Sequence, residues 1–315
     1  MDEFELIARY FDRASADADV LIGIGDDGAV LRPAIGLDLV TVVDTLVEGV
    51  HYPAELPAAD VGYRALAVNL SDLAAMGSRP RWMTLALSLR EADPAWLSDY
   101  ARGLFEAAQQ FDVTLVGGDT TRARQTVMSI QVTGEIEQGR ALTRSGARPG
   151  DEVFVTGSVG DAAAGLEILQ GRSPAGKFAD DLVSRFSRPT ARVAAGRQLV
   201  GRASAAIDLS DGLYTDLEKL AAASGVGVEL DLDCLPVSDA LRRSVVGDKA
   251  LSLALAGGDD YELCFTAAAG EFDELADVAG VPIQRIGRIA PGQGIACIRD
   301  GSPYAYHDRG YRHFS

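Results

Sequence analysis

Three stretches of this chain end an apolar run with glycine and aspartate, a pattern that predicts strands followed by tight loops and helices. They are Gly25–Gly28, Gly117–Thr121 and Asp208–Gly212. Two further aspartates join them: Asp44 at the end of the apolar run Leu39–Val43, and Asp72 in the sequence Asn69-Leu70-Ser71-Asp72. Carboxylates beside glycine at strand ends can hold a hard cation next to a phosphate. The pattern therefore indicates an α/β protein with Mg²⁺-dependent phosphoryl chemistry.

The electrostatic cost of these loops supports that interpretation. Two carboxylates ~4 Å apart repel each other by about 4 kcal/mol at an effective dielectric of 20. Several such pairs would consume much of a typical net stability of about 5–15 kcal/mol. If the loops converge, a cation is expected among them. If they do not converge, their aspartates are only turn residues, which is the more common role of a single acidic turn.

The charge of the chain restricts its partners. It carries a formal net charge of −17 over 315 residues. Nucleic acids and anionic membranes need a basic surface, so neither is an expected partner. A polyphosphate substrate would need bridging metal ions, which is a second indication of Mg²⁺.

The cysteines and the N-terminus indicate a cytoplasmic protein. Cys234, Cys264 and Cys297 are widely spaced without a CxxC pair, which favours buried thiols in a reducing compartment. The first residues are acidic where a signal peptide would be basic. No apolar run approaches the ~20 residues that span a bilayer.

Hydrophobic periodicity predicts a mixed sheet with alternating helices. The segment Leu39–Val43 is expected to be a strand buried on both faces, with Asp44 at its end. Val113–Val116 is expected to run as a strand into the double glycine. The expected helices are 3–11, 60–76, 94–111, 161–170, 190–200 and one opened by Ser210–Gly212. The other expected strands are 84–89, 127–137, 152–156, 205–208, 226–232, 261–266, 283–289 and 295–299.

The turn cluster at residues 147–151 is the expected domain boundary. It divides the chain into an N-terminal domain, residues 1–146, and a C-terminal α/β domain, residues 147–315.

One phosphate-binding motif is a false match. Gly171–Phe178 agrees with the first seven positions of a P-loop, but Phe178 replaces the Ser/Thr that binds Mg²⁺. The segment also follows an expected helix, whereas a P-loop connects a strand to a helix. ATP, if bound, must be held by other loops, and Gly117 and Gly118 allow the main chain to approach a phosphate closely.

Taken together, eight collinear motifs resemble the thiamine-monophosphate kinase family. They are Gly23–Val30, Asp44–His51, Asn69–Gly77, Gly117–Thr121, Leu142–Gly146, Asp208–Gly212, Gly257–Leu263 and Gly310–Phe314. The resemblance spans nearly the whole chain. The wider superfamily, with aminoimidazole ribonucleotide synthetase and selenophosphate synthetase, shares only the aspartate loops.

The resemblance implies a two-domain α/β (α+β) fold of the aminoimidazole ribonucleotide synthetase type, paired into a homodimer through its N-terminal domains. It also implies transfer of the ATP γ-phosphate to thiamine monophosphate, giving thiamine diphosphate and ADP. By position, the Mg²⁺ ligands would be Asp27, Asp44, Asp72, Asp119, Asp208 and Asp211. ATP would contact Gly118, Asp119, Arg144 and Ser210, and thiamine phosphate would contact His51, Glu262 and Tyr311. The number of Mg²⁺ ions and a need for a monovalent cation stay open.

The chain departs from the family at one place. Val42-Val43 stands where the family usually has Ser-Thr before the Asp44 position. Main-chain carbonyls or water would have to replace the hydroxyl ligand, which puts one outer Mg²⁺ in question but not the activity.

The residues favour direct in-line transfer. The acceptor that the resemblance implies is a phosphate monoester, which is already ionised near neutral pH, so catalysis would rest on positioning and charge neutralisation. Asp44, Asp72 and Asp119 would hold the bridging ions, and the Arg144 guanidinium could bind two phosphate oxygens at once. No serine, cysteine or histidine is placed to indicate a covalent phosphoenzyme.

Three other functions are less well supported by the residues. One is a superfamily member that uses ATP to activate a carbonyl oxygen, as in imidazole ring closure. Selenophosphate synthesis or hydrogenase-maturation dehydration would want a reactive cysteine near a terminus, and the first cysteine is Cys234. The last is a non-catalytic cation-binding module, although no loop has EF-hand spacing.

Overall fold

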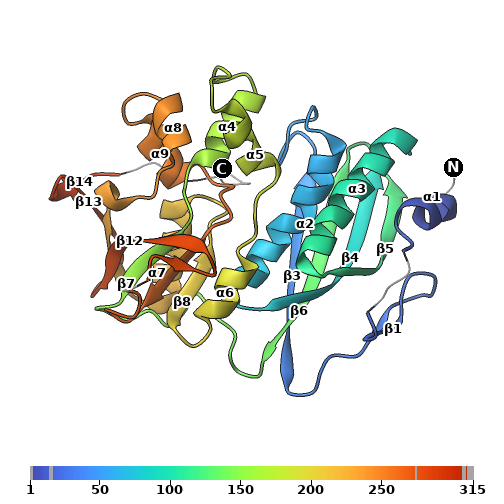
Figure 1. Ribbon diagram of the computed structural model, residues 1–315, viewed down its shortest axis with the longest axis horizontal. Coiled ribbons are helices and arrows are strands. Elements are labelled where there is room, and N and C mark those ends of the chain that lie inside the picture. The colour runs from blue at the N-terminus through green and yellow to red at the C-terminus, as the bar shows by residue number, and fades with distance from the viewer. Residues whose placement is uncertain (1–2, 14–16, 274, 307–309, 311–315) are drawn as a thin grey trace. The chain divides into compact units, whose positions relative to one another are not determined.

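The computed structural model describes residues 3–13, 17–273, 275–306 and 310 (Figure 1). The chain forms two compact units. The first comprises residues up to Leu73 together with Ser78–Gly139, and the second comprises Ala74–Gly77 with the described residues from Arg140 onward. Residues 140–146 thus pack with the second unit, and the domain boundary after residue 146 stays a prediction.

The first unit is built on a four-stranded sheet covered by helices (Figure 1). In sheet order the strands are β3 (Leu37–Val47), β6 (Val127–Glu137), β4 (Arg79–Leu89) and β5 (Thr114–Arg122). Only β4 and β5 run parallel among these pairs. The helices are α1 (Glu3–Tyr10), α2 (Ala58–Ala75) and α3 (Pro94–Phe111), and a small hairpin joins β1 (Val20–Ile22) to β2 (Val30–Leu31).

The two long helices agree with the sequence predictions. Leu66, Leu70 and Leu73 of α2 are fully buried, as their spacing predicts. Asp93 caps α3 by accepting a hydrogen bond from Ala95 N–H at 2.9 Å. Helix α3 ends at Asp112, whose left-handed backbone (φ 56°) stops the helix.

Strand β3 differs from its prediction in length and burial. It has 11 residues, so Asp44 lies inside the strand and not at its end. The side chains of Leu39, Thr41, Val43 and Thr45 are exposed, with Leu39 at 50% and Val43 at 62%, while Val40 and Leu46 are buried. The expectation of a strand buried on both faces was therefore wrong, because no described residue of this chain covers the face that carries Leu39 and Val43.

Strand β5 also runs further than its apolar run. It continues through Gly117, Gly118 and Asp119, with a register shift opposite Met83 and Thr84. Pairing with β4 supplies hydrogen bonds to these residues, so the strand does not end where the apolar residues end. A Cβ on Gly118 would lie 2.0 Å from the Leu85 carbonyl oxygen, so only glycine allows this close approach.

The second unit holds a mixed sheet, as predicted, and this sheet has eight strands. The order is β14 (Ser302–Tyr304), β13 (Gly294–Arg299), β9 (Gly227–Asp231), β12 (Val281–Ala290), β7 (Glu152–Thr156), β10 (Leu263–Ala267) and β8 (Ala203–Asp208), with β11 (Asp277–Val278) paired to β12. Among the described pairs of this sheet, only β13 and β9 are parallel. The α-helices are α4 (Asp161–Leu169), α5 (Ala179–Ser187), α6 (Val193–Leu199), α7 (Leu213–Ser224), α8 (Asp239–Ser244) and α9 (Lys249–Ala256), and a short 3-10 turn spans Leu232–Cys234.

This sheet is buried on both faces. Val153 and Val155 of β7 belong to one apolar cluster, while Phe154 between them belongs to another. Alternate residues point to opposite faces of a strand, so apolar clusters lie on both sides. Phe154 stacks on Phe265 of the neighbouring β10 with ring centroids 5.3 Å apart.

The false P-loop connects two helices. Gly171–Phe178 lies between α4 and α5, which confirms that it cannot be a strand-to-helix phosphate loop.

The three cysteine thiols are free, and Cys264 and Cys297 are buried. Burial raises the pKa of Cys297 to about 11. Every helix in the described part of the chain is too short or too polar to cross a membrane.

Candidate functional site

The structure joins two of the predicted loops in one cavity of the first unit. The cavity holds about 460 Å³. The acidic loop Gly23–Ala29 lines one side, and Leu115–Thr120 of β5 lines the other. Ile7, Phe11 and Leu85 complete the wall. Asp27 and the Gly118-Asp119 pair, which are about 90 positions apart in sequence, therefore border the same space.

Each loop has a local reason for its shape. Gly25 has φ 113°, a conformation that L side chains rarely adopt. The Asp26 carboxylate accepts a hydrogen bond from Asp27 N–H at 2.8 Å, which closes the turn. A Cβ on Gly117 would meet nothing within 4 Å. Gly117 is therefore dispensable for packing, and its small size leaves its main chain accessible from the cavity.

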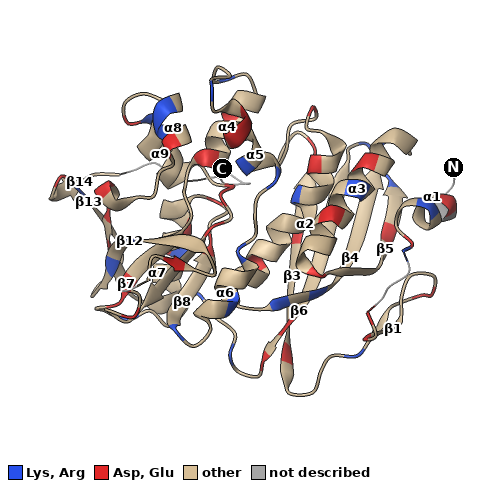
Figure 2. Cartoon of the chain, in the orientation of Figure 1, with Lys and Arg blue, Asp and Glu red and all other residues tan. Residues whose placement is uncertain are grey.

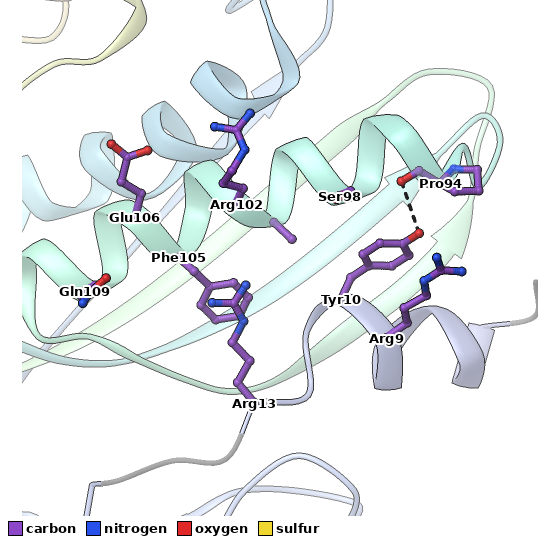
Figure 3. Close-up of a pocket in the computed structure, with 10 residues that line it drawn as sticks. Arg9, Tyr10, Arg13, Pro94, Ser98, Arg102, Phe105, Glu106 and Gln109 are labelled. Atoms are coloured by element: carbon purple, nitrogen blue, oxygen red, sulfur yellow. Dashed lines mark hydrogen bonds between the residues drawn. The ribbon is translucent and has the colours of Figure 1, made fainter.

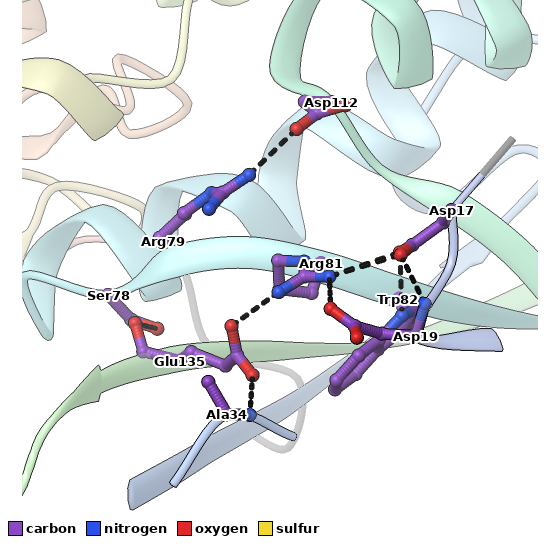
Figure 4. A network of polar contacts seen from close by, with 9 residues as sticks. All are labelled: Asp17, Asp19, Ala34, Ser78, Arg79, Arg81, Trp82, Asp112 and Glu135. Carbon is purple, nitrogen blue, oxygen red and sulfur yellow. Dashed lines mark hydrogen bonds and ion pairs between the residues drawn. The ribbon is translucent and has the colours of Figure 1, made fainter. Parts of the chain in front are cut away.

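A buried ionic network fixes the chain on both sides of the acidic loop (Figure 4). Arg81 on β4 donates to Glu135 at 2.5 Å, to Asp19 at 2.8 Å and to Asp17 at 3.2 Å. Glu135 also accepts from Ala34 N–H at 3.1 Å. Burial acts to raise the pKa of Asp17, but the hydrogen bonds from Asp19 N–H and Arg81 act more strongly in the opposite direction. The pKa of Asp17 is therefore below its usual value. The residues before β1 and after β2 are thus anchored to the sheet.

A second group of predicted residues gathers at β3 and α2. Asn69 is fully buried, and its Oδ1 accepts a hydrogen bond from Asp44 N–H at 2.9 Å. Its Nδ2 donates to the Ala65 carbonyl at 3.0 Å. Asp72 follows Asn69 by three positions and shares its side of the helix, as predicted. Asn69 therefore fixes the backbone at Asp44 beside the helix face that carries Asp72.

The two groups are separated across the sheet. Asp44 pairs with Ile130, Ile130 pairs with Leu85, and Leu85 pairs with Gly118. Three inter-strand spacings of about 4.8 Å place Asp44 roughly 14 Å from Gly118. Within one chain, this separation is too large for the Asp44 and Gly118 backbones to border the same cation.

The backbone ladder distinguishes the two valines that replace the family's Ser-Thr pair. Neighbouring residues of an antiparallel strand direct their backbone groups to opposite sides. Asp44 directs its N–H to Asn69, so Val43 directs its carbonyl to β6. The Val42 carbonyl then points to the same side as Asp44. Of the two predicted main-chain ligands, geometry favours Val42.

His51 lies in the turn that follows β3. Its Nδ1 accepts a hydrogen bond from Val47 N–H at 3.0 Å, and its own N–H donates to the Val47 carbonyl at 2.9 Å. This bond makes Nδ1 an acceptor, so a neutral ring carries its proton on Nε2. His51 is held in the orientation of an Nε2–H donor.

The predicted residues of the second unit that the structure describes lie around the end of β8. Asp208 is buried at the last position of the strand, opposite Leu263. The backbone N–H groups of Ser210 and Asp211 both donate to Asp216. Asp216 and its partner Lys219 are residues that the sequence reasoning missed, although their spacing of three on one helix could have indicated a pair.

Arg144 lies beside the same strand. The carbonyl of the preceding Thr143 accepts from Ala206 N–H at 2.9 Å, and the Arg144 carbonyl accepts from Ser224 Oγ at 3.0 Å. Arg144 is exposed. The main chain thus fixes its position while leaving the side chain toward solvent.

The loop Gly257–Glu262 supports the Asp208–Gly212 segment. Asp259 N–H donates to the Ser210 carbonyl at 2.9 Å, and Tyr261 N–H donates to the Leu209 carbonyl at 2.8 Å. Asp259 and Tyr261 have φ angles of 62° and 51°, which are unusual for residues other than glycine. Such backbone conformations carry strain of about 1–3 kcal/mol each, and they cluster at functional sites.

Glu262 is fully buried, and its carboxylate is shared by three partners. It accepts from Arg192 Nε at 2.6 Å, from Arg185 at 2.7 Å and from Thr156 Oγ1 at 2.7 Å. The structure therefore places Glu262 as the internal counter-ion of two arginines that the sequence reasoning missed. Its predicted charge contact with thiamine stays a prediction, and Tyr311 lies outside the described residues.

A larger cavity contains none of the predicted residues. It holds about 690 Å³ between α1 and α3 (Figure 3). Arg9, Arg13 and Arg102 line it, and the Arg13 guanidinium lies 3.6 Å from the centre of the Phe105 ring. Tyr10 closes one end by donating to the Pro94 carbonyl at 3.2 Å.

The donor set of the 460 Å³ cavity suits a hard cation. Asp26, Asp27 and Asp119 supply carboxylate oxygens, the ligands that Mg²⁺ prefers. Among the described residues, no three acidic, histidine or cysteine side chains converge on a single ion position. Acidic residues are spread through both units (Figure 2). A metal held here would take only some of its ligands from the protein, which is usual for Mg²⁺ bound with substrate phosphates.

Comparison with known proteins identifies the class. The chain matches the model of the AIR synthase related protein N-terminal domain over residues 25–136 and that of the C-terminal domain over residues 148–300. The fold and the two domains therefore define an AIR synthase-related protein, as the sequence predicted.

The relatives identify the family within that class. Thiamine-monophosphate kinase of Escherichia coli K12 is 49% identical over 320 residues, covering 99% of this chain and 98% of that protein. The crystal structure of thiamine-monophosphate kinase from Stenotrophomonas maltophilia K279a is 46% identical, with a TM-score of 0.85 and 96% of both chains covered. A related structure in complex with AMPPCP and TMP is 34% identical, with a TM-score of 0.82 over 92% of both chains. The chain belongs to the thiamine-monophosphate kinase family, which confirms the resemblance seen in its motifs.

Proposed function

We propose that this protein transfers the γ-phosphate of ATP to thiamine monophosphate by direct in-line attack, giving thiamine diphosphate and ADP. The observation that carries the proposal is the cavity in which Asp27 meets Gly117, Gly118 and Asp119. A glycine strand edge beside carboxylates is suited to a metal-bound polyphosphate. The full-length similarity to thiamine-monophosphate kinases supports the choice of substrates.

Mg²⁺ is the cation that these residues fit. The proposed ligands fall into three groups: Asp27 with Asp119, Asp44 with Asp72 and the Val42 carbonyl, and Asp208 with Asp211. When bound, Mg²⁺ neutralises phosphate charge and orients the reacting oxygens. The carboxylates in each group would otherwise repel one another and the incoming phosphates in a chain of net charge −17.

The protein positions ATP mainly through its main chain and two side chains. Gly117 and Gly118 allow close approach to phosphate oxygens, and Ser210 offers a hydroxyl from a loop fixed on both sides. The exposed Arg144 guanidinium supplies a forked donor for two oxygens. None of these groups is assigned a part in proton transfer.

The acceptor phosphate needs orientation more than activation. A phosphate monoester has a second pKa of about 6, so its attacking oxygen is ionised at neutral pH. His51 is held with Nε2–H as a donor, which suits a contact with that phosphate. We assign the thiamine end to the region of Glu262 and to Tyr311.

The exposed face of β3 supports a homodimer through the N-terminal domains. Leu39 and Val43 are half or more exposed, and Thr41 and Thr45 lie between and beside them on the same face. An exposed apolar strand face of this kind favours association with a second copy. The three free cysteines favour a reducing cytoplasm as the place of reaction.

Product analysis tests the proposed reaction. Purified protein would be incubated with ATP and MgCl₂, with and without thiamine monophosphate, and thiamine diphosphate and ADP would be measured by chromatography. We expect equal amounts of both products, and neither without Mg²⁺. A parallel reaction contains an aminoimidazole precursor in place of thiamine monophosphate. ADP formed with that precursor and not with thiamine monophosphate would contradict the proposal.

A further inference from the structure

A buried carboxylate holds the Ser210–Asp211 loop from inside the second unit. Asp216 on α7 is 1% exposed. Its Oδ2 accepts hydrogen bonds from Ser210 N–H at 3.0 Å and from Asp211 N–H at 2.9 Å. One side chain thus satisfies two successive backbone donors of the loop.

A lysine completes this arrangement. Lys219 Nζ donates to Asp216 Oδ1 at 2.7 Å and to Asp211 Oδ2 at 2.5 Å. Asp216 is buried, while the side chains of Lys219 and Asp211 are 38% and 34% exposed. The lysine therefore compensates the buried charge and at the same time holds one oxygen of Asp211.

The loop has little freedom to move away from this pair. The Ser210 carbonyl accepts from Asp259 N–H at 2.9 Å, so both backbone groups of Ser210 are engaged. Gly212 has φ 113°, and a Cβ there would lie 3.0 Å from the Ala256 and Leu255 main chain. The direction of the Ser210 and Asp211 side chains is consequently set by the backbone that Asp216 holds.

We propose that Asp216 and Lys219 are positioning residues for nucleotide and Mg²⁺ binding by the Ser210–Asp211 loop. Asp216 fixes the backbone so that Ser210 Oγ and the Asp211 carboxylate face their ligands. Lys219 holds Asp211 Oδ2 and leaves Oδ1 for the cation. This role rests on the proposed function, because it deepens the use of Ser210 and Asp211 in that reaction.

The charges explain why both members are needed. Without the Asp216 carboxylate, two N–H groups lose a strong acceptor and Lys219 pairs with Asp211 alone, which neutralises a metal ligand. Without Lys219, the buried Asp216 charge lies uncompensated near Asp211. Either change should weaken metal-nucleotide binding and leave the acceptor site unaffected.

The test compares Asp216→Asn with Glu218→Gln, a matched control that makes the same change at an exposed position of the same helix. Binding of AMPPCP in MgCl₂ is measured by calorimetry, and the KM values for ATP and thiamine monophosphate are measured separately. For Asp216→Asn we expect Kd for AMPPCP and KM for ATP to rise by roughly tenfold, because a neutral amide oxygen accepts these hydrogen bonds more weakly than the carboxylate and no longer balances the charge of Lys219. KM for thiamine monophosphate should change less than about twofold, and Glu218→Gln should resemble the wild type.

A lower melting temperature for Asp216→Asn with wild-type AMPPCP binding and wild-type KM for ATP would overturn the proposal. An equal rise of both KM values would do the same. If Asp216→Asn does not fold, Lys219→Gln tests the proposal instead, because it keeps the Asp216 carboxylate that accepts from the loop backbone. AMPPCP binding by Lys219→Gln should weaken at least about threefold, and Lys219→Arg should restore it. Wild-type protein that binds AMPPCP but forms no thiamine diphosphate would instead refute the proposed reaction.

Discussion

The side-chain oxygen of Asn69 accepts a hydrogen bond from the backbone N–H of Asp44 at 2.9 Å. This contact ties a helix to the middle of an edge strand, 25 positions away in sequence. Because Asn69 is fully buried, water cannot replace it. Asn69 is therefore expected to orient the Asp44 carboxylate without binding a ligand itself.

Asn69→Leu should lower both stability and activity. The Asp44 N–H loses its partner, which costs about 1–3 kcal/mol of unfolding free energy, and turnover should fall roughly tenfold or more as Asp44 shifts. Denaturant unfolding and kcat measure the two effects. Gln110→Leu removes a hydrogen-bond acceptor of Tyr63 between α2 and α3 and serves as the control, with activity retained. Full activity in folded Asn69→Leu would contradict the assignment of Asp44.

The two adjacent glycines of β5 should respond differently to alanine. In Gly118→Ala the new Cβ would clash with the Leu85 carbonyl, so the strand must separate and stability should fall by about 1–3 kcal/mol. Gly117→Ala meets nothing within 4 Å and should fold normally. If phosphate approaches this main chain, Gly117→Ala should still raise KM for ATP about tenfold. Thermal melts measure the effect on stability, and steady-state kinetics measure the effect on ATP binding. Unchanged kinetics in Gly117→Ala would show that this cavity is not part of the ATP site.

Glu262→Gln should be strongly destabilising. It leaves Arg185 and Arg192 without the buried charge that compensates them, which costs about 3–5 kcal/mol. Glu229→Gln breaks the more exposed pair with Arg288 and should cost less than about 1 kcal/mol. Urea titration measures both. A Glu262→Gln protein of normal stability with only a raised KM for thiamine monophosphate would support direct substrate contact instead.

Asp119→Asn should reduce turnover by roughly 10²–10³-fold, as expected for loss of one transition-state charge contact. In metal-free buffer its stability should be unchanged or raised by up to about 1 kcal/mol, because a carboxylate repulsion is removed. Asp99→Asn, which breaks an exposed pair with Arg102, is the control of equal charge. MgCl₂ titrations of activity and of melting temperature give the comparison. Loss of fold with an unchanged Mg²⁺ dependence would make Asp119 a structural residue.

The sequence predicted elements whose signals are local. Helix α3 and strands β6 and β7 match their predicted bounds, because apolar periodicity and turn residues mark both ends. The prediction was wrong where the length or burial of a strand depends on contacts with another segment of the chain. Pairing with β4 extends β5 through Gly118. The run of aliphatic residues in β3 does not show that one face of the strand is exposed.

The same limit applies to the site. Motifs identified the loops of Asp27 and Asp119, and the fold brings them to one cavity. They did not identify Asp216, Arg185 or Arg192, because these side chains act through partners that only the tertiary structure brings near. Spacing on a helix predicts which residues share a face, but it does not show which distant backbone group that face will contact.

The central claim is direct transfer of one phosphoryl group between two substrates held by these loops. The most direct measurement follows label from ATP carrying a labelled γ-phosphate. With Mg²⁺ and thiamine monophosphate, the label should appear in the terminal phosphate of thiamine diphosphate, and without the acceptor the protein should stay unlabelled. Label retained on the protein, or released as inorganic phosphate whether or not thiamine monophosphate is present, would contradict the account.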